Sequence, residues 1–232
     1  MGKTEHFACD VRYIKDLDIE NTMKKTYLFD FDGTLVDSMP TFGAVMLRIL
    51  EERGIKYGED TVKIITPLGY RGTAEYFRTL GVKESADELI EIMNFYARIE
   101  YENSIPAKAG VEDTLKEMKS RGYSLNVLTA SPHIALDPCL KRLGLWELFD
   151  NVWSCDDFGT TKADPEIYKM AADRIGAPID QIVFVDDNIN AVKTAKRAGM
   201  VAVGIFDESS AEYADEFKRD SDGYVFDFSE LD

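Results

Sequence analysis

The sequence is poor in basic residues, in cysteine and in long apolar runs, and each shortage excludes a class of protein. It has 27 lysines and arginines against 43 acidic residues, a net charge of −16. Nucleic acids and anionic membranes are polyanions, so we expect neither as a partner. The three cysteines (Cys9, Cys139 and Cys155) are odd in number and lack metal-ligand spacing, which indicates a reducing compartment. No apolar run approaches the roughly 18 residues of a membrane span.

The length and composition are those of an ordinary globular protein. With 232 residues, 45% of them hydrophobic, the chain can bury a sizeable core and form one large domain with at most a small second one. The first ten residues hold only a three-residue apolar stretch, so we expect no secretory signal and a cytoplasmic protein. We expect it to be a monomer or a weak homodimer.

Short apolar runs alternate with amphipathic segments along most of the chain. The runs are rich in β-branched residues, which suits strands buried on both faces. Four amphipathic segments end at a glycine (122, 144, 176 and 199), as helices with a left-handed cap do. The alternation predicts right-handed crossovers and a mostly parallel sheet. The predicted strands are 26–29, 124–128, 181–185, 201–205 and 224–226, and the predicted helices are 111–121, 133–143, 164–175 and 188–198.

The alternation is interrupted once, between residues 39 and 104. Helical patterns follow one another there, separated by glycine and proline, and no strand-like run occurs. A small all-helical insert after the first strand is therefore expected. The predicted helices of this insert are 42–53, 60–66, 73–80 and 85–102.

These patterns predict three parts of the chain. Residues 23–38 and 105–232 form the α/β core, and residues 39–104 form the helical insert. Residues 1–22 are only weakly patterned, and Met23 would be a normal start for a chain whose first strand begins at Thr26. We therefore interpret residues 1–22 as an N-terminal appendage.

The strongest chemical signal, Asp30-Phe31-Asp32-Gly33, ends the first predicted strand. Two carboxylates at this spacing point the same way only if the backbone turns between them, and Gly33 gives freedom for that turn. Asp30 is a candidate nucleophile toward phosphorus, because carboxylates form acyl-phosphate intermediates. Asp32 is a candidate proton donor to the leaving oxygen and then a proton acceptor from water. Aspartate and glycine are also common in turns and at helix caps, an interpretation that we prefer for Asp37 but not for Asp30.

A second acidic pair, Asp186 and Asp187, ends the third predicted strand. Ligands of open parallel sheets bind at the carboxyl ends of the strands, so this pair would join Asp30 and Asp32 in one crevice. Mg²⁺ would relieve the repulsion of four carboxylates, since it binds carboxylate oxygens and a substrate phosphate oxygen. One member of the pair can also partly cap the helix that starts near Asn188.

Two further residues complete the set. Thr129 ends the second strand and could donate a hydrogen bond to a phosphoryl oxygen, although a lone strand-end threonine is more often a turn residue. Lys162 precedes a helix start that contains Pro165. Its ammonium could neutralise the nucleophilic carboxylate and a phosphoryl oxygen, although most lysines are solvated surface groups. In chain order, the set is a carboxylate pair, a hydroxyl, an ammonium and a carboxylate pair.

With these motifs the chain resembles the haloacid dehalogenase-like superfamily, in its subgroup of phosphoglycolate phosphatase-like and β-phosphoglucomutase-like enzymes. The resemblance covers about residues 23–232. It implies an α/β fold, with a Rossmann-like parallel sheet core and a small inserted all-helical cap domain. It also implies that Asp30 is the nucleophile, that Asp32 is the general acid/base, and that Thr129 and Lys162 carry the second and third motifs.

The resemblance further implies a Mg²⁺ site. Its ligands would be the side chains of Asp30 and Asp187 and the backbone carbonyl of Asp32, with Asp186 close by. The third motif reads Thr-Lys-Ala around Lys162, where the family usually has Gly-Lys-Pro. Dehalogenases of the family lack a carboxylate at the position of Asp32, so its presence favours phosphoryl transfer.

Substrate contacts are also implied by the resemblance. In the core they would come from Thr129, Ala130 and Lys162. In the cap they would come from a loop whose place is taken here by Gly69 to Gly72. Arg71 in this loop could pair with a distal carboxylate or phosphate of the substrate, or be a solvated arginine in a turn. For His133 we expect a solvent-facing or helix-cap position rather than a substrate contact.

Together these features predict a Mg²⁺-dependent phosphatase of a small phosphorylated metabolite, of the phosphoglycolate or sugar-phosphate type, with an aspartyl-phosphate intermediate. The cap would exclude bulk water and leave no room for a macromolecule. A β-phosphoglucomutase-like phosphomutase is the alternative, since it would use the same residues. A phospho-accepting signalling module is disfavoured by the insert and by Asp32. A binding protein without catalysis is disfavoured because no motif position is missing.

Overall fold

A six-stranded parallel sheet forms the centre of the computed structural model, which describes residues 25–65 and 68–231. The strand order is β3-β2-β1-β4-β5-β6, so β1 lies inside the sheet and the chain changes direction beside it. Such a change of direction leaves a crevice at the carboxyl ends of β1 and β4, where ligands bind in sheets of this kind. The strands are β1 (Thr26–Phe29), β2 (Ser124–Thr129), β3 (Asn151–Ser154), β4 (Ile182–Asp186), β5 (Val201–Ile205) and β6 (Gly223–Val225).

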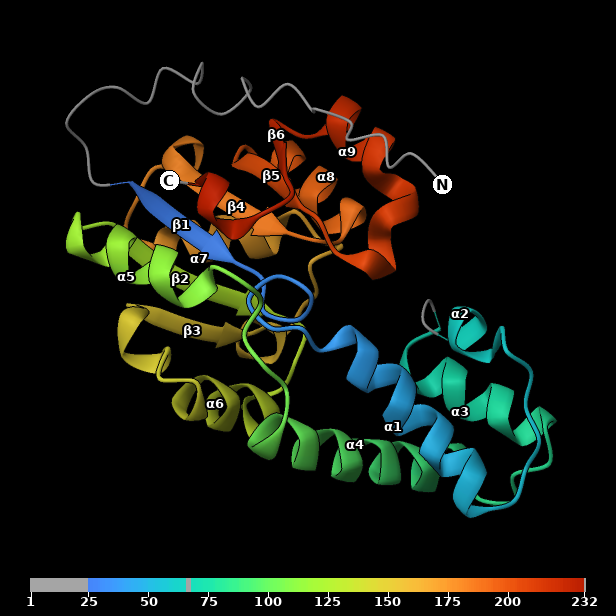
Figure 1. The fold of residues 1–232 in the computed structure, drawn as a ribbon. Helices are drawn as coiled ribbons and strands as arrows, with labels where there is room; N and C mark the ends of the chain where they lie inside the picture. Colours follow the sequence, from blue (N-terminus) through green and yellow to red (C-terminus); the bar gives the residue numbers. More distant parts are fainter. Residues whose placement is uncertain (1–24, 66–67, 232) are drawn as a thin grey trace, which may run out of the picture.

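Helices cover both faces of the sheet (Figure 1). One face carries α5 and α6, and the other carries α7, α8 and α9. All four glycines predicted to end helices have positive φ, which confirms the left-handed caps. The helices of the core are α5 (Val111–Ser120), α6 (His133–Arg142), α7 (Glu166–Ile175), α8 (Ile189–Ala198) and α9 (Ala214–Asp220).

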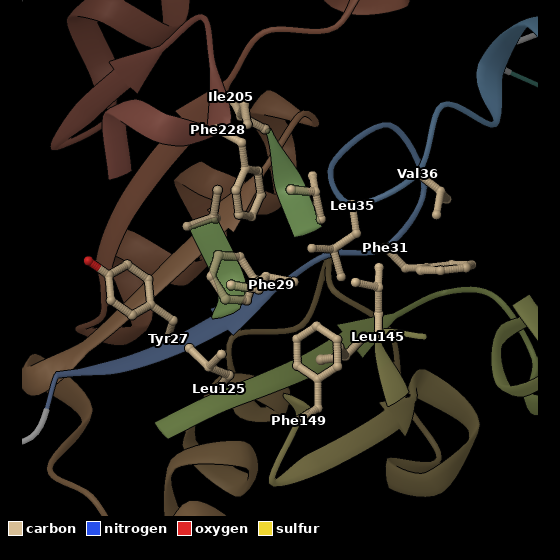
Figure 2. Packing of buried hydrophobic residues seen from close by; sticks show 14 of the residues in the cluster. Tyr27, Phe29, Phe31, Leu35, Val36, Leu125, Leu145, Phe149, Ile205 and Phe228 are labelled. Atoms are coloured by element: carbon tan, nitrogen blue, oxygen red, sulfur yellow. The ribbon is translucent and has the colours of Figure 1, made fainter. Parts of the chain in front are cut away.

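Side chains of each strand alternate between two hydrophobic cores. In β1, Tyr27 and Phe29 belong to the core on the α5 side, whereas Leu28 belongs to the core on the α7 side. Phe29 lies at the centre of the first core, with its ring centroid 5.5 Å from that of Tyr27 and 5.4 Å from that of Phe228 (Figure 2). Burial on both faces explains why the inner strands β1 and β4 are mostly apolar.

The chain between β1 and α5 folds as a helical unit with a hydrophobic core of its own. Buried side chains of this core include Met46, Phe77 and Met93. The unit extends from the carboxyl edge of the sheet (Figure 1), and we call it the cap. It is the predicted all-helical insert, although the exact residues at which it begins and ends stay a prediction. Its helices are α1 (Met39–Glu52), α2 (Thr61–Ile65), α3 (Gly69–Thr79) and α4 (Ala86–Asn103).

The two segments that join the cap to the core run side by side. The backbone N–H of Asp37 donates to the carbonyl of Pro106 at 3.0 Å, and that of Lys108 donates to the carbonyl of Leu35 at 3.0 Å. Val36 and Ala107 form an antiparallel bridge between them. These contacts tie the loop after β1 to the segment that returns from the cap.

The sequence patterns missed two elements of the core. Strand β3 lies at an edge of the sheet, paired with β2, and its first three residues are only partly buried, so it does not read as an apolar run. Helix α9 is short and mostly charged, with Phe217 as its buried residue. The predicted appendage, residues 1–22, and Cys9 lie outside the described residues. Cys139 and Cys155 are buried and unpaired. In residues 25–65 and 68–231 no helix combines the length and apolarity that crossing a membrane requires.

Candidate active site

Strand register brings the predicted site residues to one edge of the sheet. Phe29 of β1 lies opposite Val127 of β2 and Val185 of β4. The next residue, Asp30, is therefore level with the ends of both neighbours, and its backbone N–H donates to the carbonyl of Val185 at 2.9 Å. Asp186 follows Val185 directly, so its carboxylate comes beside that of Asp30.

Lys162 joins the two buried carboxylates. Its Nζ donates to Oδ1 of Asp30 and, at 2.9 Å, to Oδ2 of Asp186. The turn before α7 delivers this lysine, and the hydroxyl of Tyr168 donates to the Lys162 carbonyl at 3.0 Å. Burial alone would lower the pKa of Lys162, but the charges of Asp186 and Asp30 raise it above its usual range. The Thr-Lys-Ala motif thus places a permanent positive charge against Asp30.

Three carboxylates form a candidate metal site. Oxygens of Asp30, Asp186 and Asp187 all lie within 4.8 Å of one another. Burial raises the pKa of Asp30 to about 7; Lys162 opposes this shift, and the charges of Asp186 and Asp32 add to it. Burial, and then the charges of Asp186 and Asp30, raise the pKa of Asp187 well above its usual range. One ammonium does not balance three buried carboxylates, and their hard oxygen donors fit Mg²⁺.

Two residues of the loop after β1 hold Asp187 in place. Its backbone N–H donates to Oγ1 of Thr34 at 3.2 Å, and this hydroxyl donates to Oδ1 of Asp187 at 3.3 Å. Gly33 has a φ of +76°, and a Cβ there would stand 2.5 Å from Oδ2 of Asp187. Glycine is therefore required both by the backbone conformation and by the closeness of the carboxylate. The N-cap of α8 is Asn188, so neither aspartate of the pair caps that helix by its side chain.

Asp32 lies apart from this cluster of carboxylates. Its Oδ1 accepts a hydrogen bond from the hydroxyl of Tyr101, at the end of α4, and its Oδ2 accepts one from Oγ of Ser131. Both donors were missed in the sequence, where Tyr101 is one aromatic residue of an amphipathic helix. The structure thus separates the two aspartates of the first motif. Asp30 faces the metal site, and Asp32 faces the cap and the loop after β2.

The loop after β2 holds two of the predicted substrate contacts. Thr129 is buried, and its Oγ1 accepts a hydrogen bond from the backbone N–H of Ser131 at 3.0 Å. The Thr129 hydroxyl can then donate a hydrogen bond to a phosphoryl oxygen. Ala130, the next residue, is exposed at the start of the loop.

In the cap, the predicted substrate loop forms the first turn of α3. Gly69 begins this helix, and Arg71 forms an ion pair with Asp87 at 2.7 Å with both side chains largely exposed. Burial, and then the negative charge of Asp32, raise the pKa of Tyr70 to about 12. Tyr70 is therefore close enough to Asp32 to be affected by its charge. The roles of Gly69 and Arg71 stay predictions, and Tyr70 belongs to the predicted loop, although nothing in the sequence singled it out.

Lys108 ties the loop after β1 to the loop after β5. Its Nζ donates to the carbonyl of Gly33 at 2.6 Å, to that of Phe206 at 2.7 Å and to Oδ2 of Asp207 at 3.0 Å. A single lysine after the insert gave no signal in the sequence. Through Gly33, Lys108 supports the backbone that packs against Asp187.

His133 has a structural position at the start of α6. Its Nδ1 lies 2.7 Å from Oδ1 of Asp137, and its Nε2 lies 2.8 Å from Oδ2 of Asp157. Burial opposes protonation, but the hydrogen bonds that the ring donates to both carboxylates when protonated raise the pKa of His133. The imidazole thus bridges α6 to the short helix Cys155–Phe158.

Comparisons with known proteins agree with this geometry. A model of the haloacid dehalogenase-like hydrolases matches residues 24–199. Pyrophosphatase PpaX of Bacillus velezensis is 31% identical over 77% of this chain and 81% of its own. A phosphoglycolate phosphatase of Colwellia psychrerythraea is 26% identical over 90% of this chain and 95% of its own. The crystal structure of a Thermotoga maritima protein described as a β-phosphoglucomutase covers 90% of this chain and 97% of its own, with a TM-score of 0.77 and 24% identity. That last likeness concerns the fold.

Proposed function

The chain belongs to the haloacid dehalogenase-like hydrolases, and from that membership we propose that this phosphatase is Mg²⁺-dependent, acts on a small phosphorylated metabolite and passes through a phosphorylated Asp30. One observation carries the proposal. Lys162 holds one oxygen of the Asp30 carboxylate, while Asp32, two residues further on, is held separately toward the cap. A nucleophile and an acid/base with different environments are the pair that two-step phosphoryl transfer needs.

In the first step, Asp30 attacks the phosphorus of the ester. Lys162 holds Oδ1 of Asp30, so Oδ2 forms the new bond to phosphorus while the bond from phosphorus to the leaving oxygen breaks. Protonated Asp32 gives its proton to that oxygen, which leaves as an alcohol. The ammonium of Lys162 and the hydroxyl of Thr129 stabilise the equatorial oxygens, where charge accumulates.

In the second step, water attacks the phosphorus of the aspartyl-phosphate. Asp32, now ionised, takes a proton from the water as the new bond forms. The bond between phosphorus and Asp30 breaks, and inorganic phosphate leaves. Asp32 is then protonated again, and the site is ready for another cycle.

The carboxylates of Asp30, Asp186 and Asp187 would hold the Mg²⁺ ion. When bound, the ion supplies positive charge that offsets the nucleophile and the substrate phosphate. The backbone carbonyl of Asp32 is the further ligand that the family resemblance implies. Asp186 also receives Lys162 and the backbone N–H of Asn188, so Asp30 and Asp187 are the more available oxygen donors.

The cap lies over the site and would select the leaving group. Tyr70 and Tyr101 come from the cap and lie near Asp32, where the leaving alcohol must receive its proton. Their position supports a small substrate. Relatives named as a phosphoglycolate phosphatase and a pyrophosphatase support a phosphorylated compound of this size.

The test is phosphate release from a panel of small phosphomonoesters, including phosphoglycolate and hexose phosphates, with Mg²⁺ and with a chelator. Asp30→Asn should abolish release, because an amide does not attack phosphorus. Asp37→Asn is the matched control, since Asp37 is an exposed aspartate of the same loop. Release that survives the chelator or Asp30→Asn would refute the proposal. A requirement for a sugar bisphosphate activator would instead identify a phosphomutase.

A further inference from the structure

Both oxygens of the Asp32 carboxylate accept hydrogen bonds from hydroxyl groups. Tyr101 donates to Oδ1, and Ser131 donates to Oδ2. The two donors come from different parts of the chain, Tyr101 from the end of α4 and Ser131 from the loop after β2. Rotation of the carboxylate would therefore break two hydrogen bonds, and its orientation is defined before a substrate arrives.

Tyr101 is itself held by the core, although α4 belongs to the cap. Its ring stacks on that of Phe31, with centroids 5.9 Å apart. Its backbone carbonyl accepts hydrogen bonds from Nη2 and Nε of Arg142, at 3.2 and 3.3 Å, and Arg142 also donates to the carbonyl of Ile105. Arg142 ends α6, which lies beside α4 in Figure 1. The Tyr101 hydroxyl is thus placed by packing and by backbone contacts, independently of Asp32.

The environment keeps the Tyr101 hydroxyl protonated. Burial, and then the negative charge of Asp32, raise the pKa of Tyr101 far above its usual range. The Tyr101 hydroxyl therefore acts as a hydrogen-bond donor to Oδ1 of Asp32. Such a neutral donor is suited to orient a carboxylate that must gain and lose a proton.

We propose that Tyr101 is a positioning residue that orients the Asp32 carboxyl group toward the leaving oxygen. The inference rests on the proposed function. Tyr101 and Ser131 hold the two oxygens of Asp32, and the Tyr101 hydroxyl is itself placed by the stacking on Phe31. The plane of the carboxyl group is therefore defined, and Asp32 presents its proton in one direction. Without the Tyr101 hydroxyl the carboxyl group can rotate, and the proton points at the leaving oxygen for only part of the time.

The experiment compares two esters with Tyr101→Phe, which keeps the ring stacked on Phe31. p-Nitrophenolate leaves without a proton, whereas an alkoxide needs one. For the best alkyl phosphate of the panel, single-turnover phosphoryl transfer should slow by about 10–100-fold, the usual effect of losing a supporting hydrogen bond. The burst of p-nitrophenol from p-nitrophenyl phosphate should change by less than about threefold. A merely structural role would slow both esters alike.

Tyr96→Phe is the matched control. Tyr96 lies on the same helix and donates to Glu52 at an exposed site, so its hydroxyl removal should leave both rates unchanged. Arg142→Lys is a second variant that keeps the Tyr101 hydroxyl but weakens its backbone anchor. Arg142→Lys should also slow transfer from the alkyl phosphate more than transfer from p-nitrophenyl phosphate, but by a smaller factor. If Tyr101→Phe does not fold, this variant tests the inference in its place.

The outcomes separate the inference from the proposed function. Equal slowing of both esters by Tyr101→Phe, or no slowing of either, overturns the role of Tyr101. A wild-type protein that releases phosphate from neither ester with Mg²⁺ present refutes the phosphatase assignment instead. Selective slowing of the alkyl ester, together with an unchanged Tyr96→Phe protein, establishes Tyr101 as the residue that orients Asp32.

Discussion

Replacing the Asp30 carboxylate with an amide should stabilise the metal-free protein while abolishing its activity. Burial raises the pKa of Asp30 to about 7, against an ordinary value of 3.8. Between these two pH values the folded protein binds a proton that the unfolded chain does not bind. Stability therefore falls as the pH rises from about 4 to about 7, and the loss is complete above pH 7.

The size of the effect follows from the same values. A difference of about three pKa units corresponds to roughly 4 kcal/mol, which is an upper limit for the gain from Asp30→Asn at pH 8. For a chain of this length, each kcal/mol shifts the melting temperature by about 2–4 °C. The neutral amide resembles protonated Asp30 and can still accept the Lys162 hydrogen bond. At pH 5, where wild-type Asp30 is itself protonated, the two proteins should melt at similar temperatures.

Thermal unfolding followed by circular dichroism measures this effect. Wild type, Asp30→Asn and Asp37→Asn would be melted in a chelator at pH 5, 6, 7 and 8. We expect the gap between wild type and Asp30→Asn to widen with pH, and the exposed Asp37→Asn control to follow wild type. An Asp30→Asn protein that is no more stable than wild type at pH 8 would refute this prediction, because it would show that Lys162 fully compensates the buried charge.

Three further predictions concern the same cluster. Added Mg²⁺ should raise the melting temperature more at pH 8 than at pH 6, because protons compete for Asp30 and Asp187; equal shifts at both pH values would contradict this. Lys162→Met should lower kcat by about a thousandfold and destabilise the protein by about 3–5 kcal/mol, measured by phosphate release and by urea unfolding, because it leaves buried carboxylates unpaired. Gly33→Ala should weaken Mg²⁺ binding in calorimetry, because its Cβ would meet Asp187, whereas Gly54→Ala, at a φ of +63° with open space, should strain the backbone without this effect.

The site residues at the carboxyl ends of the strands were predictable, because an apolar run in the sequence marks where a buried strand ends. An apolar run that ends on Asp30 or Asp186 places that carboxylate at the end of a strand, and all parallel strands end at one edge. No knowledge of side-chain packing is needed for this step. The same rule failed for β3, because an edge strand with partly exposed residues has no continuous apolar signal.

The residues around Asp32 were not predictable, because their positions depend on packing between distant segments. Tyr101 is 69 residues from Asp32 along the chain, and Ser131 is 99 residues away. Tyr101 reaches the site because its ring stacks on Phe31 and Arg142 of α6 holds the end of α4 against the core. Nothing in the periodicity of α4 distinguishes this tyrosine from Tyr96, whose hydroxyl meets Glu52 at the surface.

The charges around the site explain why a strongly acidic protein can act on an anionic substrate. Lys162 is paired with Asp30 and Asp186, and Arg71 of the cap is paired with Asp87, so carboxylates already offset the positive charge of both side chains. Three buried carboxylates and one ammonium leave the crevice negative when all are ionised. A divalent cation would neutralise that charge locally, where the overall charge of −16 opposes the approach of a phosphate. Metal and substrate are therefore expected to strengthen each other's binding, by the same factor in each direction.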